Sequence, residues 1–198
     1  MDTAAKAPIT MALASFAWAE GTTSTLSTTG TNAYLIEGFF YSRTALTNQA
    51  TPTTDLNTGN AFVAMPVPGT TTGLPAGVAS APDDGGYACA FLLGFNAAGT
   101  LLATQGPIVP IDVAGNYIQG APSLSPSLGL PGPNPGTVAG IVANNNFCPC
   151  GFIVVKSGSA ATATFTFGTT SWTTTGYTTS IGNIASLPGR SLANLTYS

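Results

Sequence analysis

Histidine is absent from this chain of 198 residues, and charge is scarce, with 7 acidic and 4 basic side chains. General acid–base catalysis, nucleophilic catalysis and metal binding mostly need clustered titratable groups, and histidine is the usual one near neutral pH. The composition therefore argues against an enzyme. We expect no catalytic residues, no cofactor and no bound metal.

The low charge also excludes two kinds of partner. The formal net charge is -3, whereas attraction to nucleic-acid phosphates or anionic lipids needs clustered positive charge. We therefore expect neither a nucleic acid nor a membrane as partner. A surface made mostly of Thr, Ser, Asn, Gln and Gly has little charge repulsion against self-association. Such a surface suits a component of a packed assembly.

Cysteine is nearly as rare as charge. The chain has Cys89 and the pair Cys148 and Cys150, and the odd count argues against a disulfide framework. A zinc site would need a fourth ligand that is not histidine. We expect buried apolar thiols; the alternative is one bridge from Cys89 to Cys148 or Cys150.

The N-terminal region imitates a secretory signal. Lys6 precedes an apolar run over residues 8–17, and Ala17-Trp18-Ala19 resembles a small-residue cleavage site. Asp2 and Pro8 oppose this interpretation, so we expect an ordered N-terminal arm over residues 1–30. No other stretch approaches the ~20 apolar residues that span a bilayer.

Residue types elsewhere favour strands. Val, Ile, Thr, Tyr, Phe and Trp cluster in short runs separated by Gly, Pro, Asn and Asp, which is typical of all-β proteins. We predict a single β-sandwich or barrel-like domain over residues 31–190, followed by a tail at 191–198. Besides one hairpin, the expected strands are 33–42, 61–67, 151–156, 163–168, 169–179 and 180–187.

The clearest local pattern predicts a β-hairpin over residues 87–105. Two apolar runs flank Asn96-Ala97-Ala98-Gly99, and glycine can take the positive φ that such a connection needs. The two-residue period places alternate side chains, Cys89 included, on one face. The predicted core residues are Phe91, Leu93, Phe95, Ile153, Val155, Phe165 and Phe167.

Residues 115–146 are rich in proline and glycine and cannot form regular sheet. In a polyproline-like conformation, the 17 residues from Gly120 to Gly136 could extend ~50 Å. A loop of this length inside a compact domain is usually either functional or disordered.

Several motifs in order resemble small virion proteins of tailed bacteriophages. They cover about half of the chain, from Tyr87 to Arg190, although Ser191 stands where that pattern has a proline. The motifs are residues 91–94, Asn96–Gly99, Gln105-Gly106-Pro107, Cys150–Lys156, Phe167–Thr170 with Trp172, and Leu187-Pro188-Gly189-Arg190.

The resemblance implies a head decoration or cement protein. Such a subunit is β-rich and often trimeric, has no catalytic residues, and stabilises the outer shell at junctions between major capsid proteins. It would be made in the host cytoplasm and end on the capsid surface, with the major capsid protein and its own copies as partners. Extended segments and rare charges are the expected interface elements. The predicted interface residues are Trp18, Arg43, Pro122, Pro126, Leu130, Pro131, Pro133, Pro135 and Arg190.

Three other functions stay open on the sequence. The chain could be a tail, spike or head-fibre subunit for host attachment, or a secreted cell-surface adhesin subunit. A hydrolase would require the fold to bring together two of the scattered carboxylates, among them Glu20, Glu37, Asp55 and Asp112.

Overall fold

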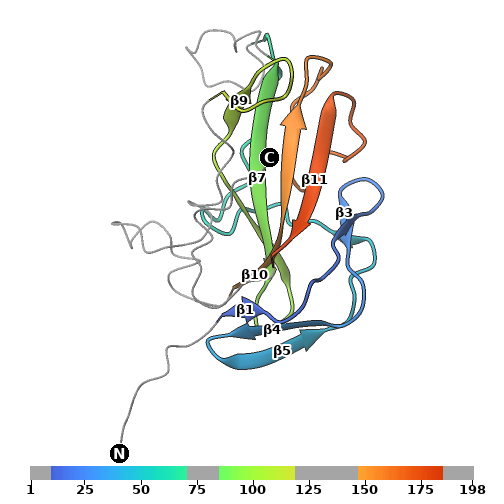
Figure 1. The fold of residues 1–198 in the computed structure, drawn as a ribbon, viewed down its shortest axis with the longest axis vertical. Helices are drawn as coiled ribbons and strands as arrows, with labels where there is room; N and C mark the ends of the chain where they lie inside the picture. Colours follow the sequence, from blue (N-terminus) through green and yellow to red (C-terminus); the bar gives the residue numbers. More distant parts are fainter. Residues whose placement is uncertain (1–9, 71–84, 119–146, 185–198) are drawn as a thin grey trace, which may run out of the picture.

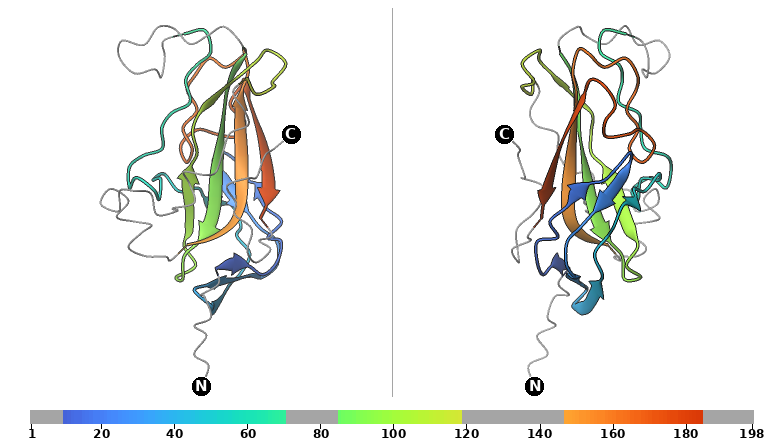
Figure 2. Two further views of the ribbon diagram at one scale, coloured as in Figure 1. Left: turned by 60° about the vertical axis from the view of Figure 1, so that its left-hand side comes forward. Right: turned by 90° about the vertical axis from the view of Figure 1, so that its right-hand side faces the viewer.

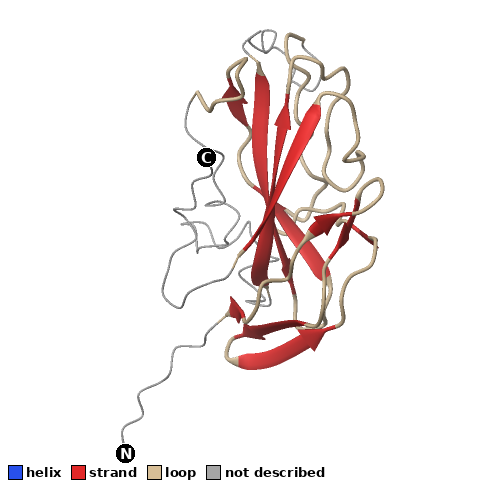
Figure 3. Ribbon diagram, turned by 45° about the vertical axis from the view of Figure 1, so that its right-hand side comes forward, coloured by secondary structure: helices blue, strands red, loops and turns tan. Residues whose placement is uncertain are grey.

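The computed structural model describes residues 10–70, 85–118 and 147–184, and these residues form strands and turns without a helix (Figure 3). The all-β prediction is therefore confirmed. The strands are β1 (Met11–Ala12), β2 (Ala19–Glu20), β3 (Thr25–Ser27), β4 (Asn32–Ile36), β5 (Phe39–Arg43), β6 (Gln49–Ala50), β7 (Gly86–Phe95), β8 (Leu101–Gln105), β9 (Val109–Ile111), β10 (Cys148–Ser157) and β11 (Tyr177–Asn183).

The largest sheet has five antiparallel strands in the order β11-β10-β7-β8, with β9 also paired to β7 (Figure 1). β8 and β9 pair with successive parts of β7 on the same edge, because Gly106-Pro107-Ile108 interrupts the strand between them. The hydrogen-bonded order ends at β8 and β11, so the described strands do not close into a barrel.

Two small antiparallel sheets complete the described structure, in the orders β1-β4-β5 and β2-β3-β6. The β1-β4-β5 sheet lies at one end of the long axis of the molecule, opposite the end that carries β9 (Figures 1 and 2). One core cluster contains residues from all three sheets, including Ala12, Leu26, Tyr34 and Phe91.

Both faces of β7 are covered, which explains its nearly continuous apolar sequence. Phe91 stacks on Phe167 with ring centroids 4.4 Å apart, and Phe95 stacks on Trp18 at 5.8 Å. On the opposite face, Ala90 and Leu92 belong to a smaller buried cluster. The pair β7 and β10 is therefore the centre of the fold.

The hairpin predicted over residues 87–105 is confirmed as β7 and β8. Gly99 in its connection has φ +74°. The prediction of one strand over residues 33–42 is wrong, because the chain reverses there to form β4 and β5. Glu37 and Gly38 both have positive φ, 52° and 83°, as a two-residue type I′ turn requires.

Three other predicted strands are shorter or missing. Residues 61–67 and 163–168 meet through an isolated bridge between Met65 and Phe165 rather than in regular strands. Residues 169–176 form turns, and β11 begins at Tyr177. Threonine-rich runs have strand-like composition, but here their hydroxyls bond neighbouring backbone groups, as Thr169 does with the carbonyl of Thr166.

Residues 10–30 pack into the fold instead of extending from it. They contribute β1, β2 and β3, and they bury Ala12, Phe16, Trp18 and Leu26 in the main core. Residues 1–9, most of the proline-rich loop and the predicted tail at 191–198 lie outside the described residues.

Candidate interaction site

The most exposed aromatic side chains in the described part of the chain lie together at the start of β5. Phe39 is 69% exposed and Phe40 is 64% exposed. A buried phenylalanine is the usual outcome, and Phe91 and Phe95 of β7 follow that rule. The β4–β5 hairpin therefore presents apolar surface that folding does not bury.

The hairpin holds these two rings in a fixed register. Its type I′ turn at Glu37-Gly38 matches the twist of the flanking strands, and Ile36 pairs with Phe39 while Leu35 pairs with Phe40. Alternate residues of β4 are buried, namely Asn32, Tyr34 and Ile36. The opposite face of the sheet carries Leu35 of β4 and its partner Phe40 of β5. This outer face is therefore also apolar.

A tyrosine connects the hairpin to the main sheet. Tyr34 is fully buried, and its hydroxyl donates to the carbonyl of Asn96 at 2.8 Å. Its ring stacks on Phe95 at 5.7 Å. Burial raises the pKa of the Tyr34 hydroxyl, so the hydroxyl stays protonated and remains a donor. The hairpin is thus fixed to the β7–β8 turn.

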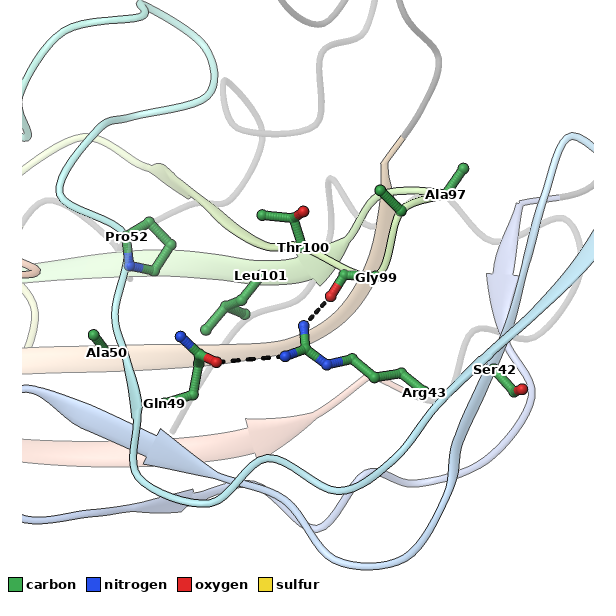
Figure 4. A pocket seen from close by; sticks show the side chains of 10 residues that line it. Ser42, Arg43, Gln49, Ala50, Pro52, Ala97, Gly99, Thr100 and Leu101 are labelled. Carbon is green, nitrogen blue, oxygen red and sulfur yellow. Dashed lines mark hydrogen bonds between the residues drawn. The ribbon is translucent and has the colours of Figure 1, made fainter.

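A cavity of about 540 Å³ lies beside the other end of β5. Its walls come from β5, from β6 and the segment that follows it, and from the connection between β7 and β8 with the first residue of β8 (Figure 4). The lining residues are Ser42, Arg43, Gln49, Ala50, Pro52, Ala97, Ala98, Gly99, Thr100 and Leu101.

Arg43 is the one charged residue in the lining of this cavity. Its guanidinium donates to the carbonyl of Gly99 and, at 3.4 Å, to Oε1 of Gln49 (Figure 4). The guanidinium carbon also lies 5.4 Å from the centroid of the Phe95 ring, a favourable cation–π distance. These contacts hold Arg43 in place and leave some of its five N–H donors available.

No carboxylate pairs with Arg43 within the described residues, where the groups that contact its guanidinium are all neutral. A neutral carbonyl and an amide satisfy some guanidinium donors but do not balance its charge. Glu37 lies in the turn before β5 and is exposed. Its backbone N–H donates to Thr10 Oγ1 at 3.0 Å, and within the described residues no basic side chain pairs with its carboxylate. Within the described residues, the hairpin therefore has one unbalanced acidic side chain in its turn and one unbalanced basic side chain at the last residue of β5.

The structure places the predicted site residues in different surroundings. Arg43 lies at the cavity, whereas Trp18 lies in the core of its own subunit, 5% exposed. The Trp18 indole N–H donates to the carbonyl of Cys150 at 3.1 Å, and Gly151 lacks the Cβ that would clash with the indole. Trp18 thus serves folding. The predicted interface residues outside the described part are Pro122, Pro126, Leu130, Pro131, Pro133, Pro135 and Arg190.

All seven predicted core residues are buried, each 0–1% exposed; they are Phe91, Leu93, Phe95, Ile153, Val155, Phe165 and Phe167. The exposed rings of Phe39 and Phe40 are not predicted, because a single strand over residues 33–42 leaves no place for the turn. Glu37-Gly38 between two alternating apolar runs is the signal that could have found it.

The three cysteines are buried and form no disulfide. The thiol of Cys89 lies near the carbonyl of Gly106 at 3.4 Å, and burial raises its pKa to about 12. Cys148 Sγ and Cys150 Sγ are 3.8 Å apart on β10, and burial also raises the pKa of Cys150. Thiols in this state are poor nucleophiles.

The carboxylates of the described residues show no constellation for catalysis. Asp55 is buried and accepts hydrogen bonds from its own turn, from Asn57 N at 3.0 Å and Thr58 Oγ1 at 3.3 Å. Asp112 lies in an exposed turn, where its carboxylate accepts hydrogen bonds from the backbone N–H and the side-chain amide of Asn116. In this part of the chain no three His, Cys, Asp or Glu side chains gather as metal ligands, and no helix is long and apolar enough to cross a membrane.

Comparisons of the chain with protein-family models, curated proteins and solved structures give no match. The functional interpretation therefore depends on the residues of this chain alone.

Proposed function

We propose that this protein is a structural subunit of a virion, a decoration or cement protein that binds and stabilises the head shell of a bacteriophage. Its role is to make contacts, and it carries no catalytic site. The partners proposed are the major capsid protein and further copies of the chain, on the capsid surface. The resemblance of residues 87–190 to small phage virion proteins names this class of protein.

One structural observation supports an interaction role most directly. The hairpin of β4 and β5 is fixed to the main sheet by Tyr34, yet it exposes Phe39 and Phe40. Exposed aromatic side chains on a rigid element are typical anchors of protein interfaces. The scarcity of charge on the chain lowers the repulsion that keeps soluble proteins apart.

We further propose that the three sheets form one β-sandwich-like domain. The main core cluster joins Ala12 of β1, Leu26 of β3 and Phe91 of β7 in a single apolar interior. A single rigid domain would transmit the force borne at the hairpin into the long strands β7 and β10.

Electron-microscopy imaging of the native particle that contains the chain tests the proposed role. A decoration protein gives many copies at fixed positions on the icosahedral shell. A few copies on a tail or at one vertex would instead indicate an attachment subunit. A chain that purifies with no particle would contradict both virion roles.

An add-back experiment then tests the surface. Shells that lack the chain are mixed with the native protein, with Phe39→Asp, or with the control Val113→Asp, which changes another exposed side chain. We expect Phe39→Asp to bind at least about tenfold more weakly, and Val113→Asp to bind like the native chain. Equal binding by all three proteins would exclude the hairpin as the shell contact.

A second variant addresses the proline-rich loop. Deleting residues 120–136 should weaken shell binding and leave the β-fold intact, because no described strand is interrupted. Loss of the β signal in circular dichroism would show instead that this segment belongs to the core.

A further inference from the structure

The cavity beside the end of β5 carries one unbalanced positive charge. Arg43 is the one charged residue in its lining, and within the described residues no carboxylate contacts the guanidinium. A second cavity, of about 400 Å³, differs because both Lys156 and Asp112 line it. Its charges are of opposite sign, whereas the lining of the Arg43 cavity has no anion of its own. The Arg43 cavity is therefore the better place for an anionic ligand.

The guanidinium of Arg43 is held in place before any ligand arrives. It donates to the carbonyl of Gly99 and, at 3.4 Å, to Oε1 of Gln49, and its carbon lies 5.4 Å from the centroid of the Phe95 ring. These two hydrogen bonds leave other N–H donors of the guanidinium unused. A side chain that is already fixed loses little conformational freedom when a ligand binds, which favours binding.

Gln49 adds a second, uncharged donor to the same cavity. Its Oε1 accepts from Arg43, so its amide nitrogen points away from the guanidinium (Figure 4). Within the described residues no protein group accepts a hydrogen bond from Gln49 Nε2. The lining thus offers N–H donors from two side chains, one of them charged, and no acidic side chain.

We propose that this cavity binds a carboxylate ligand on Arg43, with a second acceptor group of the ligand near Nε2 of Gln49. The two oxygens of a carboxylate match the planar guanidinium fork, and its single negative charge balances Arg43. A phosphate group carries about −1.5 to −2 charges near pH 7, and the lining has no second cation for it. The volume of about 540 Å³ lies within the roughly 300–1,000 Å³ of small-ligand sites.

This inference does not rest on the proposed virion role, because it names only the chemistry of the ligand. An acidic side chain of a partner protein and a free carboxylic acid share that chemistry. The affinity for a small carboxylate ion should be in the millimolar range, because such an ion has few atoms to contact. A larger ligand that also reaches Gln49 should bind more tightly.

Nuclear magnetic resonance of the isotope-labelled full chain tests the proposal. Sodium acetate replaces sodium chloride at constant ionic strength, so that screening stays the same. We expect saturable shifts of the Arg43 guanidinium N–H and of the backbone amides of Gly99 and Thr100, and none from the neutral acetamide. Acetate without saturable shifts, or equal shifts from acetamide, would overturn the proposal. Tighter binding of inorganic phosphate would overturn the choice of a carboxylate.

A second ligand identifies the source of the carboxylate. A tripeptide with blocked ends and a central glutamate presents an acidic side chain together with backbone carbonyls. Tighter binding of this peptide than of acetate would assign the site to an acidic side chain of a partner, and the reverse order would assign it to a free acid. If neither ligand binds, the proposal is overturned.

Two substitutions of basic residues test the role of Arg43. Arg43→Gln should weaken acetate binding at least about tenfold, because hydrogen bonds to charged groups contribute that much. Lys156→Gln is the control, since it removes the same charge at the second cavity, and it should bind acetate like the native chain. Acetate binding that survives Arg43→Gln, or that falls equally in both variants, would overturn the assignment to Arg43.

Gln49→Glu decides if Arg43→Gln does not fold. This change keeps the size of the side chain and places a carboxylate next to the guanidinium, where Oε1 of Gln49 now lies 3.4 Å away. The chain then supplies the anion itself, so acetate binding should weaken at least about tenfold. Unchanged acetate binding by Gln49→Glu would overturn the proposal.

Discussion

Two aromatic regions of this molecule differ in how far their rings are buried. In the β7–β10 region, Phe91 and Phe167 are 0–1% exposed and stack at 4.4 Å. In the β4–β5 hairpin, Phe39 and Phe40 are about two-thirds exposed, although their backbone is equally regular. The first region buries its apolar surface on folding, and the second leaves it exposed. Composition alone does not separate them, because both are short aromatic runs.

The largest difference should appear when one ring is removed from each region. Phe167→Ala should lower the free energy of unfolding by about 3–5 kcal/mol, because it leaves a cavity in a packed aromatic stack. Phe40→Ala should change it by less than about 0.5 kcal/mol, as for other exposed positions. Urea denaturation measures both. Similar losses for the two variants would remove the distinction between the regions.

A buried polar contact gives the next largest effect. Trp18→Phe removes the donor to the Cys150 carbonyl and part of a core ring, so unfolding should cost about 2 kcal/mol less. The Cys150 carbonyl keeps its bond from Ile184 N at 3.1 Å, which limits the loss. Thermal unfolding measures the change. A neutral effect would mean that Trp18 does not serve the core.

A substitution in the hairpin turn should lower the free energy of unfolding by less than either core substitution. Gly38→Ala places a side chain at φ +83° with open space around it, so only backbone strain is added, about 1 kcal/mol. Gly158→Ala is the control, because its φ is not positive and the nearest atom would lie 3.8 Å from the new Cβ. If both variants unfold at the same denaturant concentration, the type I′ geometry carries no strain.

The smallest expected effect concerns pH and two aspartates. Burial raises the pKa of Asp55 above its ordinary value of 3.8, while hydrogen bonds from Asn116 lower that of exposed Asp112. Folded Asp55 binds a proton more tightly than the unfolded chain does, so its contribution makes stability fall as pH rises from about 4 through the raised pKa. Asp112 contributes stability that is lost as pH falls below 3.8 through its lowered pKa.

Denaturant titrations from pH 3 to pH 7 separate the two groups. Asp55→Asn should remove the decline of stability with rising pH, and Asp112→Asn should not. A native profile that rises steadily between pH 4 and pH 6, unaltered by Asp55→Asn, would contradict the assigned direction.

The sequence predicted the centre of this fold better than its ends. Long apolar strands with alternating or continuous burial, such as Tyr87–Phe95 and Gly151–Lys156, depend on local pattern and were found. The β4–β5 turn was missed because Glu37 is an unusual residue at positive φ. The short strands β1, β2, β3 and β6 exist through tertiary pairing, which local composition does not encode.

The candidate site was predictable only in part. The rarity of charge drew attention to Arg43, but its cavity is built from residues near positions 43, 49 and 99 that only the fold brings together. Trp18 seemed suited to an interface, yet Gly151 admits its indole to the core. The surroundings of Arg43 and of Trp18 both depend on packing between residues that are far apart in the sequence.

Hydrogen–deuterium exchange of the native chain in dilute solution tests the division between the two regions most directly. The amides of β7 and β10 should be protected, because they lie in the buried centre of the main sheet. The amides of Phe40 and Ser42 should exchange freely, because they point away from β4 and have no backbone partner within the described residues. Slow exchange at Phe40 and Ser42 would contradict the account, because the outer edge of β5 would then be covered within the chain itself.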